Sequence, residues 1–122
     1  MAQRFDVYEV SLELVVAMRL VVERVKQHDR DLAAQLKRAT SSVPANIAEG
    51  QRRVGRDRIH LWRIAEASAN EVRCEIEVAV AWGELDPAIA EPARHLLDRI
   101  LAMLWRLTHV SPAAATRTPA TP

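Results

Sequence analysis

Residues 6–27 decide the fold of this chain, and they read DVYEVSLELVVAMRLVVERVKQ. Apolar residues that recur every three or four positions form one stripe along an α-helix. That stripe contains Val7, Leu14, Met18, Val21 and Val25. Asp6 and Glu9 have the spacing of a capping box, in which both side chains bind backbone N–H groups at a helix start. The segment therefore predicts a helix that begins at Asp6 and ends near Gln27.

The same helix carries more apolar residues than one buried face requires. Thirteen of the nineteen residues from 7 to 25 are apolar, whereas a single core-facing side needs about eight. The additional residues contribute to a second stripe: Phe5, Tyr8, Leu12, Val15 and Val22. In an isolated four-helix bundle each helix keeps a solvent side, so the second stripe predicts a subunit interface. The alternative is a helix at the centre of a small bundle.

A second helix is predicted from Asp29 or Asp31, either of which is a plausible N-cap, to Gly50. Its apolar residues keep the helical period: Leu32, Leu36, Ala39, Val43 and Ile47. Pro44 lies inside this helix, where it removes one backbone donor and crowds the carbonyl group of Thr40. We therefore expect a bend at Pro44.

The third and fourth helices follow a polar, arginine-rich connection over residues 51–57, and the third ends at Gly83. The pair Asp86-Pro87 is typical of a helix start, because proline at the first helical position has no N–H to leave unpaired. It begins a last helix that ends near His109. Pro92 either bends the first turns of this helix or marks where its regular part begins, and the signal at Asp86-Pro87 favours the bend.

These elements predict an all-α domain over residues 1–109, folded as an antiparallel up-down four-helix bundle. The chain has 122 residues, of which 49% are hydrophobic, so it can bury one core but is too short for two domains. Residues 111–122 hold three of the six prolines and no large apolar side chain. We expect residues 110–122 to form a disordered tail rich in Ala, Thr and Pro.

The composition also predicts a cytoplasmic protein with no membrane contact. The longest apolar run covers only residues 100–105, whereas a helix needs about 20 apolar residues to span a bilayer. The N-terminus lacks the apolar core of a signal peptide. The single cysteine, Cys74, has no partner for an intrachain disulfide, and neighbouring glutamates predict an unreactive thiol.

No motif of a catalytic or metal site occurs in the sequence. The four histidines are His28, His60, His95 and His109, and no two lie close enough along one helix to share a metal ion. The Glu-x-x-His pairs that build di-iron sites in other bundles are absent. Three dispersed glycines cannot form a phosphate-binding loop. We therefore predict that the protein is not an enzyme and has no catalytic residues, metal or cofactor.

The three tryptophans lie at helical spacing among apolar neighbours: Trp62, Trp82 and Trp105. We interpret them as packing residues of the core or of a subunit interface rather than as base-stacking residues.

The near-neutral net charge of +1 hides a basic stretch. Residues 37–63 carry a local net charge of +5. Arginines dominate it, and their planar guanidinium groups suit bidentate contacts with phosphate. The predicted phosphate-binding residues are Lys37, Arg38, Arg52, Arg53, Arg56 and Arg58. The alternative is a solvated connection whose charges pair with Asp57 or Glu66. Several copies of the patch in one oligomer would bind a polyanion with avidity.

Residues 43–50, VPANIAEG, resemble the S-[IV]-P-x-N-I-A-E-G signature of a family of small bacterial four-helix bundle proteins. The family includes proteins encoded in intervening sequences of large-subunit ribosomal RNA genes and the accessory variability protein of diversity-generating retroelements. Three further segments resemble the family: Arg4-Phe5-Asp6-Val7-Tyr8, Gln35-Leu36-Lys37-Arg38-Ala39 and Ala65-x-x-Ser68-x-x-Glu71. The resemblance covers about residues 4–108.

This resemblance implies a homopentamer of four-helix bundles without enzymatic activity. For the retroelement members it also implies binding of nucleic acid and of a reverse transcriptase through a basic surface. The signature residues are Pro44, Asn46, Glu49 and Gly50, and we interpret Asn46 and Glu49 as a buried polar network. The chain departs from the family at Gly55, where a serine is usual, so Asp57 is the expected substitute cap of the third helix.

The sequence thus favours a non-enzymatic homo-oligomer, pentameric by resemblance, that binds RNA or DNA through the arginine-rich patch, with a reverse transcriptase as a further possible partner. Little base reading is expected, because exposed aromatic residues are few. The alternative is an oligomeric scaffold that binds a protein partner and whose arginines serve only solubility.

Overall fold

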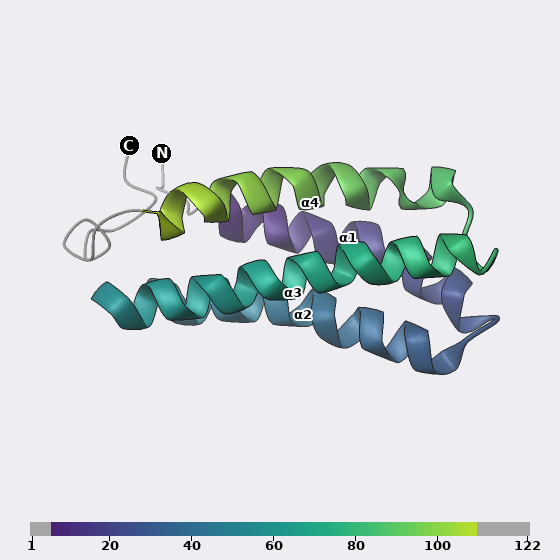
Figure 1. Cartoon of the computed structure of the whole chain (residues 1–122), viewed down its shortest axis with the longest axis horizontal. Helices are drawn as coiled ribbons and strands as arrows, with labels where there is room; N and C mark the ends of the chain where they lie inside the picture. Colours follow the sequence, from purple (N-terminus) through teal and green to yellow (C-terminus); the bar gives the residue numbers. More distant parts are fainter. Residues whose placement is uncertain (1–5, 110–122) are drawn as a thin grey trace.

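The computed structural model describes residues 6–109, which form four α-helices joined by short connections (Figure 1): α1 (Asp6–Lys26), α2 (Arg30–Gln51), α3 (Gly55–Ala81) and α4 (Pro87–Thr108). Successive helices run in opposite directions, and each packs against two others: α1 and α3 both contact α2 and α4. The predicted antiparallel four-helix bundle is confirmed. The tail predicted over residues 110–122 lies outside the described residues.

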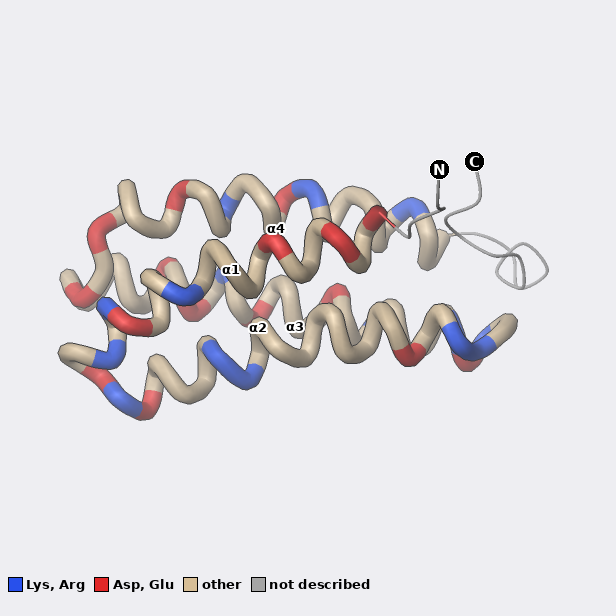
Figure 2. Tube along the Cα trace, turned by 180° about the vertical axis from the view of Figure 1, so that it is seen from behind, with Lys and Arg blue, Asp and Glu red and all other residues tan. Residues whose placement is uncertain are grey.

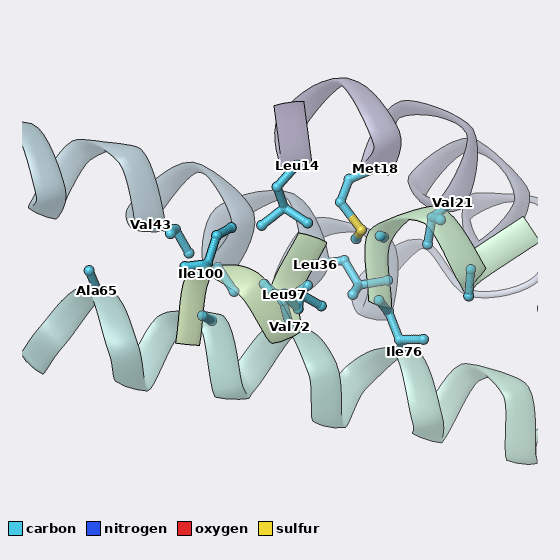
Figure 3. Close-up of a cluster of buried hydrophobic side chains, with 14 of the residues drawn as sticks. Leu14, Met18, Val21, Leu36, Val43, Ala65, Val72, Ile76, Leu97 and Ile100 are labelled. Carbon is cyan, nitrogen blue, oxygen red and sulfur yellow. The ribbon is translucent and has the colours of Figure 1, made fainter. Parts of the chain in front are cut away.

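The core is a single cluster to which all four helices contribute, and Figure 3 shows its middle layers. The first apolar stripe of α1 is buried as predicted, and Leu36, Val72 and Leu97 are the facing residues of α2, α3 and α4. Each fully buried side chain of this size stabilises the fold by about 1.5–3 kcal/mol. Burial of these stripes therefore fixes which side of each helix faces inward.

Helices α2 and α4 begin as the sequence predicts. Asp29 caps α2, and its carboxylate accepts a hydrogen bond of 2.9 Å from the backbone N–H of Leu32. Asp86 caps α4 in the same way through the N–H of Ala88. Pro92 lies inside α4, so the predicted start at Asp86-Pro87 is confirmed.

The start of α3 differs from the prediction. The helix begins at Gly55, the N-cap is Val54, and no side chain caps the first turn. Asp57, the expected cap, lies in the first turn instead. Gly55 has a φ of +59°, a left-handed conformation that a serine would adopt with strain. This conformation explains why glycine occupies the position. The connection between α2 and α3 consists of residues 52–54.

The second stripe of α1 is divided between the edge of the core, against which Tyr8 and Val22 pack, and the surface. Leu12 is exposed, Tyr8, Val15 and Val22 are half-buried, and Phe5 lies outside the described residues. Two further apolar residues that the predicted stripe omitted, Val16 and Leu20, are also exposed: Val16 by 59%. The bundle of one chain therefore leaves a strip of apolar surface along α1.

Candidate nucleic-acid interface

The structure separates the predicted basic residues into two groups. Lys37 and Arg38 lie in the middle of α2, whereas Arg52, Arg53 and Arg56 lie around the connection to α3. Residues 38 and 52 are fourteen positions apart, which is about 21 Å along a helix. We call Arg52, Arg53 and Arg56 the basic corner. All three are exposed, and Figure 2 shows basic segments at this end of the bundle, where α4 also ends.

Arg58, the sixth predicted residue, is not part of this surface. It is only 5% exposed. Its Nε donates a hydrogen bond of 3.1 Å to the carbonyl oxygen of Gly50, and its Nη2 donates one of 2.8 Å to that of Gln51. Both carbonyl groups lie at the end of α2, where the Gly50 oxygen also accepts the backbone N–H of Arg53 at 3.0 Å, and the helix dipole favours a cation at this end. Arg58 therefore caps α2, and its prediction as a phosphate ligand is wrong.

Trp62 completes this cap from the next turn of α3. The indole Nε1 donates a hydrogen bond of 3.1 Å to the carbonyl oxygen of Ile47, and the guanidinium carbon of Arg58 lies 5.4 Å from the ring centroid. Burial lowers the pKa of Arg58 from its ordinary value. A Cβ atom at Gly50 would lie 2.5 Å from the Trp62 Nε1. Gly50 is therefore the residue that lets the tryptophan pack against α2.

Asn46 and Ser42 connect α2 to α3 through polar contacts. The Asn46 side-chain amide donates to the carbonyl oxygen and to the hydroxyl of Ser42, both at 2.9 Å. The same hydroxyl lies 2.9 Å from the hydroxyl of Ser68 on α3. Asn46 thus belongs to an interhelical polar network, as predicted.

Glu49 does not belong to that network. Its carboxylate lies at the surface and forms an ion pair of 3.0 Å with Arg53, one turn further along the chain. The prediction of a buried role for Glu49 is wrong. The pair also neutralises part of the charge of Arg53, which leaves Arg52 and Arg56 as the cations of the basic corner with no ion pair within residues 6–109.

Arg38 faces an acidic pair on α3 rather than open solvent alone. Burial, reinforced by the charge of Glu71 and a hydrogen bond with it, raises the pKa of Glu75 to about 7, and the charge of Arg38 opposes this rise. One carboxylate oxygen of Glu75 is buried without a hydrogen-bond partner among the described residues. The acidic neighbours reduce the positive potential around Arg38, so this part of α2 is a weaker anion site than the basic corner.

Lys37 lines a groove between α1 and α2. The groove has a volume of about 250 Å³ and a mainly apolar lining that includes Val15, Met18 and Val22, with Arg19 and Lys37 at its sides. The buried hydroxyl of Thr40 lines it too and has no hydrogen-bond partner in the part of the chain that the structure describes. Val15 and Arg19 of the groove lie within one helical turn of Leu12 and Val16 in the exposed apolar strip of α1.

The tryptophans divide between core and surface. Trp62 is buried, as expected of a packing residue, but Trp82 is 73% and Trp105 56% exposed. Trp105 follows Leu104 and so lies off the buried stripe of α4. Its ring stacks on that of His109, with centroids 4.1 Å apart and planes at 18°. Arg63 of α3 reaches the same end of α4, because its Nη2 donates to the carbonyl oxygen of Thr108 at 3.4 Å.

Within residues 6–109 no group of three or more His, Cys, Asp or Glu side chains is placed to hold a metal ion. No helix of the described chain is both long and apolar enough to cross a membrane. The single cysteine, Cys74, is exposed and has no disulfide partner.

The fold and the site together define a class of protein: a small antiparallel four-helix bundle whose arginine-rich corner lies beside a helix end capped by hydrogen bonds from side chains. The model of the family described as 23S rRNA-intervening sequence protein matches residues 3–106, and the chain belongs to this family. The resemblance seen at residues 43–50 is thereby confirmed. A comparison with curated proteins found no significant match.

One similar solved structure is a protein with unknown function from the S23 ribosomal protein family of Bacteroides thetaiotaomicron. Its TM-score to this chain is 0.77 at 22% sequence identity, and the match covers 85% of this chain and 99% of that one. At this identity the likeness shows a shared fold.

Proposed function

We propose that this protein is a non-enzymatic, cytoplasmic homo-oligomer that binds the phosphate backbone of RNA or DNA through its basic corner. The observation that carries the proposal is the exposure of Arg52, Arg53 and Arg56 around the connection between α2 and α3, beside the end of α2 that Arg58 and Trp62 cap. A rigid backbone lowers the entropy lost when the arginines bind. The family description, which refers to an intervening sequence of 23S rRNA, supports RNA as the polyanion.

Lys37 and Arg38 form a second, weaker part of the proposed contact surface. They lie about 21 Å from the basic corner along α2, a distance that spans about six phosphates of one duplex strand. One nucleic acid can therefore contact Lys37, Arg38 and the basic corner together only if it is at least this long.

Self-association is the second element of the proposal. The exposed strip of α1, which includes Leu12, Val16 and Leu20, lies beside the groove that Arg19 and Lys37 line. Contiguous apolar surface of this kind is typical of an interface. We propose that a second copy of the chain covers it, and the family resemblance suggests a ring of five. Each ring then presents several basic corners, and weak phosphate contacts add up through avidity.

The test is a binding assay with a fluorescein-labelled 20-nucleotide RNA and the matching duplex DNA at 50 mM salt. We expect the Arg52→Glu and Arg56→Glu double variant to lose binding. The matched control reverses Arg24 and Arg30, exposed arginines at the opposite end of the bundle, and keeps most of the affinity. Equal losses in both variants would show a non-specific charge effect and contradict the proposal.

A reverse transcriptase as partner is a separate proposal that rests on the family resemblance alone. Co-purification with such an enzyme encoded nearby tests it.

The alternative function is an oligomeric scaffold that binds a protein partner. If the oligomer forms but neither RNA nor DNA binds, the nucleic-acid proposal fails and this alternative is favoured.

A further inference from the structure

An exposed aromatic pair occupies the end of α4. Trp105 is 56% exposed although most large apolar residues of the bundle are buried. Its indole is paired with the imidazole of His109 in a near-parallel stack. His109 is fixed in turn, because its Nδ1 lies 2.8 Å from the Trp105 carbonyl oxygen and 3.3 Å from the Thr108 hydroxyl. We call Trp105 and His109 the aromatic platform.

Two arginines, Arg63 and Arg106, lie at the same end of the bundle as this platform. Arg63 donates a hydrogen bond to the Thr108 carbonyl oxygen, which places its guanidinium group beside the last turn of α4. Arg106, also exposed, follows Trp105 directly. Arg56 lies seven positions before Arg63 on α3 and therefore on the same side of that helix, about 10 Å away along the axis. Arg56 and Arg63 thus connect the basic corner with the aromatic platform.

The other exposed tryptophan has different surroundings. Trp82 lies at the opposite end of the bundle, where α3 ends, and is followed by Glu84 and Asp86. Acidic neighbours repel a phosphate backbone. Arg24 lines a pocket with Gly83 and Glu84 at this end, so acidic neighbours oppose its charge, whereas Arg63 and Arg106 lie at the end of α4.

We propose that the aromatic platform of Trp105 and His109 stacks an unpaired base of a single-stranded nucleic acid whose phosphates bind Arg56 and Arg63. The inference rests on the proposed function and narrows its ligand. Proteins that bind single strands combine a positively charged track with aromatic rings, because every base has a π-face. The bases of an intact duplex are stacked on each other, so an exposed surface platform discriminates in favour of single strands.

The experiment compares three labelled 20-unit chains by fluorescence anisotropy at 50 mM salt: oligo(U) RNA, oligo(dT) DNA and an abasic chain with the same phosphates. The proteins are the wild type, Trp105→Ala and Trp82→Ala. We expect Trp105→Ala to bind the base-containing chains about tenfold more weakly, which corresponds to about 1.4 kcal/mol. Its affinity for the abasic chain stays the same, and Trp82→Ala resembles the wild type throughout. A loss for the RNA, the DNA or both supports the platform and identifies the strand it takes.

Equal affinity of the wild type for base-containing and abasic chains would overturn the inference, as would an unchanged affinity of Trp105→Ala. Failure of the proposed function gives results that differ from these. In that case neither the base-containing nor the abasic chains bind, or the Arg52→Glu and Arg56→Glu variant binds both types with the affinity of the wild type. A second readout guards against misfolding of Trp105→Ala. In the Trp82→Phe variant the remaining tryptophans are Trp62, which is buried, and Trp105, which is exposed. We expect oligo(dT) to quench the fluorescence of Trp105 and the abasic chain to leave it unchanged. Equal quenching by both chains would contradict stacking.

Discussion

Gly50→Ala is the substitution that most directly tests how the corner between α2 and α3 is built. The added methyl group would lie 2.5 Å from Nε1 and 2.6 Å from Cδ1 of Trp62, and 3.3 Å from the Arg58 carbonyl oxygen. The indole is 1% exposed, so it has no open space in which to rotate. We therefore expect the ring to shift and to lose its hydrogen bond to the Ile47 carbonyl oxygen.

Three effects set the size of the change. Overpacking a core position destabilises a protein by about 1–3 kcal/mol. Leaving the buried indole N–H without its partner adds about 1–3 kcal/mol. Alanine is a better helix former than glycine, and this offsets about 1 kcal/mol. The expected net loss in the free energy of unfolding is about 3 kcal/mol, within a range of about 1–5 kcal/mol, and the melting temperature falls by about 10 °C.

The assay is urea unfolding followed by circular dichroism at one fixed protein concentration, with a double-mutant cycle as control. In a Trp62→Leu background the ring is absent, so Gly50→Ala is expected to be neutral or to stabilise by about 1 kcal/mol. The reasoning is refuted if Gly50→Ala destabilises both backgrounds equally, or if it leaves the wild type as stable as before.

Three other outcomes follow from the contacts described. Arg58→Met removes two guanidinium hydrogen bonds from the end of α2 and lowers the free energy of unfolding by about 2 kcal/mol in urea. Because the Arg58 cap also holds the backbone beside the basic corner, the affinity for RNA falls, but less than in the Arg52→Glu and Arg56→Glu variant; an equal loss in a folded Arg58→Met protein would return Arg58 to the interface. Burial and Glu71 raise the pKa of Glu75 to about 7, so its contribution to stability falls as the pH rises from about 4.5 through 7. Glu75→Gln is therefore expected to be more stable than the wild type by about 1 kcal/mol at pH 8, a value reduced for solvent screening of this half-buried group. At pH 4 the two proteins are expected to have the same free energy of unfolding. If the difference in stability between them did not change with pH, the raised pKa would be contradicted. The double variant Leu12→Glu and Val16→Glu places two charges on the apolar strip. We expect light scattering to give the mass of one 13.7 kDa chain, while the helix content stays the same. A wild type that is itself monomeric would contradict the self-association proposal.

The helices and their core faces could be predicted from the sequence because they depend on local periodicity and on capping residues. The α1 stripe, the Asp29 cap and the Asp86-Pro87 start all follow from spacing within one element. The failures concern side chains whose partners are one turn away or on another helix. Glu49 and Arg53 are four positions apart, a spacing that indicates a surface ion pair, and the pattern was available in the sequence.

Arg58 shows what a charge count misses. It precedes Trp62 by four positions and therefore shares the buried side of α3. That spacing is a signal of burial, but the carbonyl groups that make burial of a guanidinium favourable belong to the end of α2. No pattern within α3 specifies them. The same limit applies to Arg63, whose contact with the Thr108 carbonyl oxygen depends on the packing of α3 against α4.

The central claim, that the basic corner binds a phosphate backbone, is tested most directly by the salt dependence of wild-type affinity for a 20-nucleotide single strand. Three arginines that each neutralise one phosphate give a log–log slope of about −2 for a single strand, or about twentyfold weaker binding at 200 mM than at 50 mM salt. Several subunits on one strand steepen this slope. Affinity that does not change with salt, or no binding at 50 mM salt, would contradict the account.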